Sequence, residues 1–233
     1  MTIDYSAMEK IAFFDFCETL VDFQTADAFV HFVRNNHGNK RMNRLNQWVS
    51  FLNRTYIIVL IEKILPNRSI NKRLVLRQLK GMPQDKIEKY ANDYYNEMIK
   101  PHLIPQMILL LHNLQHDGYR VVLVSGGYYQ YLKYFAADNN IAEDDILSTR
   151  IGVEGNVCTG RFDGRDCMGE NKVIFLDKRF DRTGIQSISF SDSVSDLPFL
   201  LWTDEQYVVS RDKEQEWAKN NSFKQIVWRQ KDV

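Results

Sequence analysis

Apolar and polar positions alternate along this chain in two different rhythms. Short apolar runs predict strands at 10–15, 119–125, 187–192, 206–210 and 224–228, and a strand with a hairpin within 146–165. Helical spacing of apolar residues predicts helices at 105–117, 128–138, 170–179, 195–202 and 212–219. Strands that alternate with helices indicate right-handed crossovers and a parallel sheet covered on both faces. We therefore expect an α/β fold with a Rossmann-like three-layer α/β/α core.

One long segment interrupts this alternation. Residues 24–36 carry apolar residues at helical spacing, and residues 40–98 look helical apart from breaks at Pro66-Asn67 and Gly81-Met82-Pro83. We interpret residues 22–100 as an all-helical cap domain inserted after the first strand. Residues 1–21 and 101–233 then form the α/β core.

Composition narrows the class of protein. The chain has 233 residues, is 44% hydrophobic and 26% charged, and has a formal net charge of zero, which is typical of a globular domain. Because Lys and Arg are not in excess, a nucleic-acid partner is not expected. Cys17, Cys158 and Cys167 lack the spacing of a disulfide framework, and residues 1–10 lack the apolar region of a signal peptide. Both features predict a cytoplasmic protein with reduced thiols.

The segment 39–68 combines basic and apolar residues and allows two interpretations. We favour an amphipathic cap helix that packs on its neighbours. The alternative is an apolar lip beside basic residues, suited to a membrane surface or a lipid-linked phosphate. The apolar run at 56–61 is too short to span a bilayer, which takes about 20 residues.

Polar residues collect where three of the predicted strands end. The first strand ends at Asp15, the second at Ser125 before two glycines, and a later one at Ser191-Asp192, with Asp196 following and Lys172 on the preceding helix. In a parallel sheet these ends face one crevice. Carboxylates suit Mg²⁺, and Lys172, Ser125 and the amides near Gly126 can bind a phosphoryl group. Asp15 can act as a nucleophile and form an aspartyl-phosphate.

Four segments resemble, in order, the four motifs of the haloacid dehalogenase superfamily. They are FFDFCETL (13–20), VVLVSGG (121–127), GENK (169–172) and FSDSVSDLPFL (190–200). The segment VEGNVCTGRFDGRDCMGENKVIFL (153–176) also resembles the Gly-rich hairpin and lysine helix of the phosphoserine-phosphatase-like branch, whose members carry a helical cap of the type expected here. The resemblance extends over nearly the whole chain.

The resemblance implies a role for each matching residue. Asp15 would be the nucleophile and a Mg²⁺ ligand. The other groups implied at the metal are the backbone carbonyl of Cys17, Asp192 and Asp196, the last supporting either the metal or Lys172. The groups implied to hold the phosphoryl are Ser125, Gly126 and Lys172.

Cys17 departs from the family pattern, which has an aspartate acid–base at this position. Residues two apart in an extended chain point the same way, so the thiol should face the site. A thiol is mostly neutral at pH 7 and forms weak hydrogen bonds. Three interpretations follow: a substrate whose leaving group needs little protonation, such as an acyl or anomeric phosphate; an acid supplied by Glu18 or the cap; or a slow or non-catalytic relative that binds a phosphorylated ligand. We predict an active hydrolase, with phosphoryl transfer to an acceptor other than water as a further alternative.

The cap is expected to select a small phosphorylated substrate. In phosphoserine phosphatases a glutamate near the start of the cap holds the ammonium group of the substrate. Alignment from the first motif puts Gln24 at that position. A neutral amide argues against phosphoserine as the substrate. The sequence predicts no particular oligomeric state.

Overall fold

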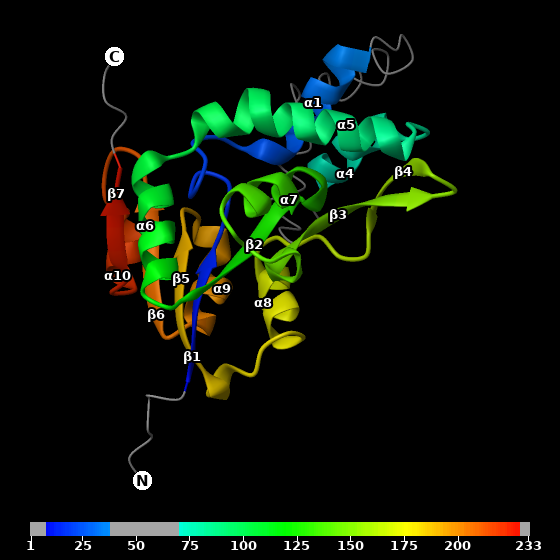
Figure 1. Cartoon of the computed structure of the whole chain (residues 1–233). Helices are drawn as coiled ribbons and strands as arrows, with labels where there is room; N and C mark the ends of the chain where they lie inside the picture. Colours follow the sequence, from blue (N-terminus) through cyan, green and yellow to red (C-terminus); the bar gives the residue numbers. More distant parts are fainter. Residues whose placement is uncertain (1–7, 38–69, 229–233) are drawn as a thin grey trace.

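The computed structural model describes residues 8–37 and 70–228, and its centre is a seven-stranded sheet (Figure 1). The strands lie in the order β4-β3-β2-β1-β5-β6-β7. Their bounds are β1 Glu9–Phe14, β2 Arg120–Tyr128, β3 Ile146–Glu154, β4 Val157–Asp163, β5 Ile185–Ser191, β6 Glu205–Ser210 and β7 Lys224–Val227. Neighbouring strands are parallel except in the antiparallel β3–β4 hairpin. The predicted α/β class and parallel sheet are confirmed.

Helices cover both faces of the sheet. They are α6 Pro105–His116, α7 Tyr129–Asp138, α8 Glu170–Asp177, α9 Leu197–Trp202 and α10 Glu216–Asn220. Alternate residues of β1 enter different cores, because successive side chains of a strand point to opposite faces. Phe14 packs in a cluster with residues of α6 and α7, whereas Phe13 packs with residues of α8 and α9. The three-layer core is thus built from both faces of β1.

A helical segment lies between β1 and α6, as the sequence predicts for the part that the structure describes. It comprises α1 Thr25–His37, α4 Ile70–Leu76, α5 Gln84–Tyr94, a π-helical turn Tyr95–Ile99, and 3₁₀ turns at Arg77–Leu79 and Lys100–His102. Figure 1 shows α1, α4 and α5 beyond the end of the sheet to which β1 and β2 point. Apolar residues of α1, α4 and α5 join the same core cluster as α6 and α7. The domain boundaries at 22 and 100 remain a prediction.

The edge of β4 is bonded to this helical segment. The Gly81 amide donates to the Cys158 carbonyl and the Cys158 amide donates to the Met82 carbonyl, both at 2.8 Å. The Gln84 amide donates to the Asn156 carbonyl, also at 2.8 Å. Gly155 and Asn156 have φ values of +55° and +61°, which the two-residue turn between β3 and β4 requires. The hairpin therefore extends the sheet far enough to meet the break predicted at 81–83.

Two predicted elements differ from the structure. β2 continues past Ser125 through the glycines to Tyr128, with a shift in its register against β3. The helix predicted at 212–219 is wrong over its first half, because α10 begins only at Glu216. The Ser210 hydroxyl donates to the Lys213 carbonyl and the Gln215 amide donates to the Gln225 side chain, at 2.8 and 2.7 Å. These bonds hold residues 211–215 in a turn.

Two further expectations concern the membrane and the cysteines. The basic and apolar segment 39–68 lies outside the described residues, as do the break at Pro66-Asn67 and the whole run at 56–61. No helix within 8–37 and 70–228 is long and apolar enough to cross a bilayer. All three cysteines are free thiols, as predicted.

Candidate functional site

The carboxyl ends of three adjacent strands form one side of a cavity of about 340 Å³. β1 lies between β2 and β5 in the sheet, so Ser125, Asp15 and Asp192 follow one another along its edge. The predicted site residues that line this cavity are Asp15, Cys17, Gln24, Ser125, Gly126, Lys172, Asp192 and Asp196. Glu18, the alternative acid, does not line it. The structure thus brings these eight residues together, and their individual roles remain predictions.

Lys172 is the centre of a buried ion cluster. It lies in the first turn of α8, and its Nζ atom contacts Asp15 Oδ1 at 2.6 Å and Asp196 Oδ2 at 2.5 Å. The Ser191 hydroxyl donates to the same Asp196 oxygen at 2.7 Å. Burial alone would lower the pKa of Lys172, but the neighbouring carboxylates raise it above its usual range. Lys172 is therefore a fixed cation, held by Asp196 against the side chain of Asp15.

The two glycines that follow Ser125 in β2 lie too close to their neighbours for larger residues to replace them. A Cβ atom on Gly126 would lie 2.5 Å from Met168 Cγ, and one on Gly127 would lie 2.8 Å from the Tyr131 hydroxyl. The Gly127 amide donates to Ser125 Oγ at 3.0 Å. This end of β2 presents the buried hydroxyl of Ser125 and the backbone of Gly126 to the cavity, an arrangement suited to binding an anionic oxygen.

Cys17 faces the site, as predicted, but its thiol is engaged by hydroxyl groups. Cys17 Sγ lies 3.1 Å from Thr25 Oγ1, which is 2.7 Å from the Tyr131 hydroxyl. Burial, followed by the charge of Asp15, raises the pKa of Cys17 to about 12. Because the thiol stays neutral at physiological pH and its hydrogen-bond partner is the neutral hydroxyl of Thr25, this group is a poor acid–base catalyst.

The structure also places Glu18, the named alternative for the acid, and Gln24, the residue predicted to select the substrate. The side chain of Glu18 accepts a hydrogen bond of 2.5 Å from Gln24 Nε2, and Glu18 is exposed and does not line the cavity. Gln24 does line it, at the start of α1. Its predicted role in substrate selection remains a prediction.

The acidic side chains fit a divalent cation. Burial raises the pKa of Asp15 to about 6, against the lowering effect of Lys172. Burial and the charges of Asp15, Glu18 and Asp196 raise the pKa of Asp192 to about 8. Carboxylates that repel one another in a buried site are stabilised in their charged form when a cation lies between them. Oxygen ligands of this kind suit Mg²⁺.

Side chains alone do not complete such a site. Within residues 8–37 and 70–228, no three His, Cys, Asp or Glu side chains are grouped so that they could hold one ion. Asp196 is already bound to Lys172 and Ser191, so its implied contribution to the metal remains a prediction, while its contact with Lys172 is direct. Asp15 and Asp192 would therefore need the Cys17 carbonyl and water as further ligands, and Mg²⁺ commonly retains several waters.

Lys72 is a residue of this cavity that the sequence analysis missed. It is only 6% exposed and its Nζ atom donates to Asp166 Oδ1 at 2.5 Å, to Thr149 Oγ1 at 3.0 Å and to the Gly126 carbonyl. It thereby joins α4 to the end of β2 that follows Ser125. Its signal in the sequence was a lysine on the same helical face as Val75 and Leu76, where an apolar residue is expected.

Replacing Lys72 by Met should destabilise the protein strongly. Asp166, which is 3% exposed, would be left as a buried charge without its cation, and breaking a buried pair typically costs about 3–5 kcal/mol. Urea unfolding measures the loss. The exposed Lys86 on α5 provides a matched control, because Lys86→Met should change the free energy of unfolding by less than about 0.5 kcal/mol. A loss below about 1 kcal/mol for Lys72→Met would contradict the importance of this ion pair.

Several solved structures share this fold at low sequence identity. A protein of unknown function from Bordetella pertussis Tohama I aligns with a TM-score of 0.76 and 17% identity, over 94% of this chain and 98% of that one. A phosphoserine phosphatase solved as an analogue of its phospho-aspartyl intermediate aligns with a TM-score of 0.63 and 19% identity, over 94% and 93%. A substrate-bound phosphoserine phosphatase aligns with a TM-score of 0.59 and 19% identity, over 86% of each chain.

No curated protein matches the chain. The family model of haloacid dehalogenase-like hydrolases matches residues 12–201, which include all four motifs in full and most of the predicted α/β core. This match covers well over half of the sequence. The chain therefore belongs to the haloacid dehalogenase-like hydrolase family.

Proposed function

We propose that this protein is a Mg²⁺-dependent phosphatase that hydrolyses a small phosphorylated metabolite through an aspartyl-phosphate on Asp15. The observation that carries this proposal is the contact of a buried Lys172 with Asp15 in a cavity that Ser125 also lines. Membership of the hydrolase family and the fold shared with phosphoserine phosphatases support it further.

Asp15 and its neighbours can perform both halves of a hydrolysis. Lys172 binds Asp15 Oδ1, which leaves Oδ2 to attack the phosphorus atom. The bond from phosphorus to the leaving oxygen then breaks, and the leaving group departs with the electron pair. Water attacks the same phosphorus in the second step, and the bond from phosphorus to the Asp15 oxygen breaks with its electron pair on that oxygen. One proton of the water stays on the released phosphate, and Asp15 returns to its carboxylate form. Lys172 and Ser125 would hold the phosphoryl oxygens throughout.

The metal would be held by Asp15, the Cys17 carbonyl and Asp192. When bound, Mg²⁺ supplies positive charge that reduces the repulsion between an anionic nucleophile and an anionic substrate. Asp196 is proposed to keep Lys172 in position, since the same oxygen of Asp196, Oδ2, contacts Lys172 and accepts from the Ser191 hydroxyl.

The substrate is proposed to have a leaving group that departs with little protonation, such as an acyl or anomeric phosphate. A neutral thiol at position 17 supplies no acid, and Glu18 lies outside the cavity. The predicted cap, residues 22–100, is proposed to select the substrate, because its residues Gln24, Asn71 and Lys72 line the cavity. The neutral amide of Gln24 makes an ammonium-bearing substrate such as phosphoserine a poor fit.

Turnover of p-nitrophenyl phosphate with Mg²⁺, followed by a panel of phosphorylated metabolites, tests this function. We expect hydrolysis that is lost when a chelator removes the divalent ion and regained when Mg²⁺ is returned. Acyl and sugar-1-phosphates should be better substrates than simple alkyl phosphates. Activity that persists with chelator present would contradict the role of the metal.

The main alternative is a phospholigand-binding relative without turnover, which the neutral thiol at Cys17 favours. Binding of phosphorylated metabolites with no release of phosphate would support it. If phosphate appears instead on an added alcohol acceptor, the protein is a phosphotransferase.

A further inference from the structure

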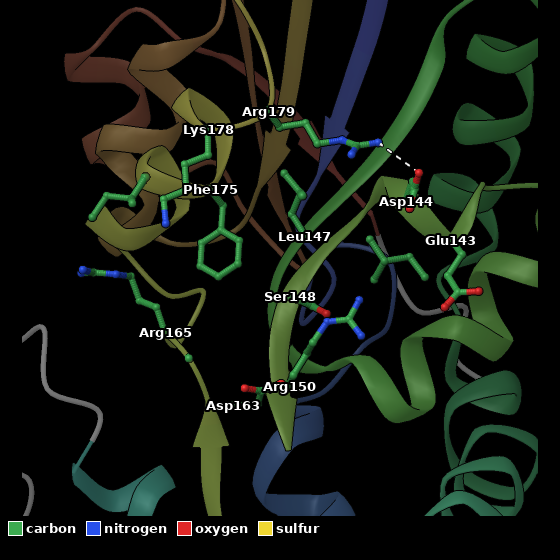
Figure 2. Close-up of a pocket in the computed structure, with 13 residues that line it drawn as sticks. Glu143, Asp144, Leu147, Ser148, Arg150, Asp163, Arg165, Phe175, Lys178 and Arg179 are labelled. Carbon is green, nitrogen blue, oxygen red and sulfur yellow. Dashed lines mark ion pairs between the residues drawn. The ribbon is translucent and has the colours of Figure 1, made fainter. Parts of the chain in front are cut away.

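A second cavity, of about 420 Å³, lies away from the candidate active site. Figure 2 shows it between β3, the turn after β4 and the later part of α8. It shares no lining residue with the cavity around Asp15. Its volume is within the range of about 300–1,000 Å³ typical of small-molecule sites.

One end of this second cavity has basic groups available for an anion. Arg165 and Lys178 both line it and are exposed. Arg165 donates from Nη1 to Asn171 Oδ1 at 3.0 Å, and its remaining N–H groups can donate to a ligand. The acids at the opposite wall are already engaged. Glu143 accepts a hydrogen bond from Tyr129, and Asp144 pairs with Arg179 at 3.9 Å (Figure 2).

The middle of the cavity is apolar. Phe175, Ile174 and Leu147 line it, and Figure 2 shows the Phe175 ring between the ends of Arg165 and Lys178 and the strand that carries Ser148. An aromatic or short aliphatic group would pack against this surface.

The other end of the cavity is lined by Ser148 and Arg150. Ser148 is 4% exposed, and its Oγ atom is closed off from the cavity, with no hydrogen-bond partner among the residues that the structure describes. Ser148 and Leu147 are successive residues of β3, so their side chains point to opposite faces of the sheet. The Ser148 hydroxyl is therefore not available to a ligand that packs on Leu147.

We propose that this cavity is a binding site for a small organic anion. A phosphate, sulfonate or carboxylate group is held by Arg165 and Lys178, and the apolar body lies on Phe175 and Leu147. Guanidinium groups bind such oxyanions with paired hydrogen bonds. The proposal does not depend on phosphatase activity.

The site adjoins three chain segments that also reach the active-site cavity. Thr149 follows Ser148, Asp166 follows Arg165, and Lys172 lies on the helix that carries Phe175. Thr149 and Asp166 both bind Lys72. A ligand here would contact the backbone that positions those side chains.

The test uses two probes on the full chain, 4-acetylbenzenesulfonate and 4-ethylbenzenesulfonate, which differ in the acceptor oxygen. Amide chemical shifts in NMR spectra should change on residues 146–150, 163–165 and 174–178. The double variant Arg165→Gln/Lys178→Gln should bind each probe about tenfold more weakly or worse, since the two substitutions remove charged donors. Ser148→Ala should leave the affinity for both probes unchanged, because the Ser148 hydroxyl is closed off from the cavity.

Lys86→Gln, an exposed change on α5, serves as the control and should bind both probes as the wild type does. If the double variant lacks a dispersed spectrum, Lys178→Gln alone replaces it. Three results would each overturn the proposal: no binding at millimolar probe, shifts confined to residues around Asp15 and Ser125, or equal affinity in the charge-removing variants and the wild type.

Discussion

Asp15→Asn should abolish phosphatase turnover, with a fall in kcat on the order of 10⁴-fold or more, because an amide cannot replace the carboxylate as nucleophile. Rapid acid quench of the wild type followed by intact-mass measurement should detect one added phosphoryl group, and the variant should show none. The folded state should survive, because the change removes one negative charge from a cavity where carboxylates outnumber lysines.

Asp212→Asn is the matched control for this variant, as Asp212 is exposed and does not line the cavity. It should keep full activity and the same thermal unfolding midpoint. An Asp15→Asn protein that is folded and still turns over p-nitrophenyl phosphate would rule out Asp15 as the nucleophile.

Cys17→Asp should raise kcat/KM for alkyl phosphates by about 10²–10⁴-fold, the usual size of general acid–base catalysis. The new carboxylic acid would protonate the leaving oxygen, which the neutral thiol does poorly. The kcat/KM for aryl and acyl phosphates should rise little, since their leaving groups depart without protonation. Parallel assays of both substrate classes measure the difference.

The gain should also depend on pH, with a predictable sign. An acid must be protonated to donate, so the advantage of Cys17→Asp is expected at low pH and should fade as pH rises through the pKa of the new carboxyl group. The wild-type thiol, with its pKa raised to about 12, adds no such titration near neutral pH. Cys17→Asn matches the shape of aspartate without an acid, and an equal gain in that variant would disprove the acid–base explanation.

Much of the site could be predicted because its chemistry sits at strand ends. Asp15, Ser125 and Asp192 each follow a recognisable apolar run, and the order of parallel strands places such ends together. Lys172 was found through its motif, and its contact with Asp15 follows from the start of α8 at the same edge.

Contacts between distant segments could not be predicted in the same way. Lys72 and Asp166 are 94 positions apart in the sequence, and only the packing of α4 against the sheet brings them together. Tyr131 reaches Thr25 in a similar way from α7. The turn at 211–215 was missed because its hydrogen bonds come from Ser210 and Gln225, which helical spacing does not register.

The backbone bonds between 81–84 and the tip of the β3–β4 hairpin restrict how substrate can enter. A swing of the α4–α5 unit away from the sheet would break three main-chain hydrogen bonds and the buried contact of Lys72 with Asp166. Rearrangement of side chains at the rim of the cavity requires none of these bonds to break. Opening of the α4–α5 unit therefore carries a cost in hydrogen bonds and buried charge that side-chain rearrangement does not.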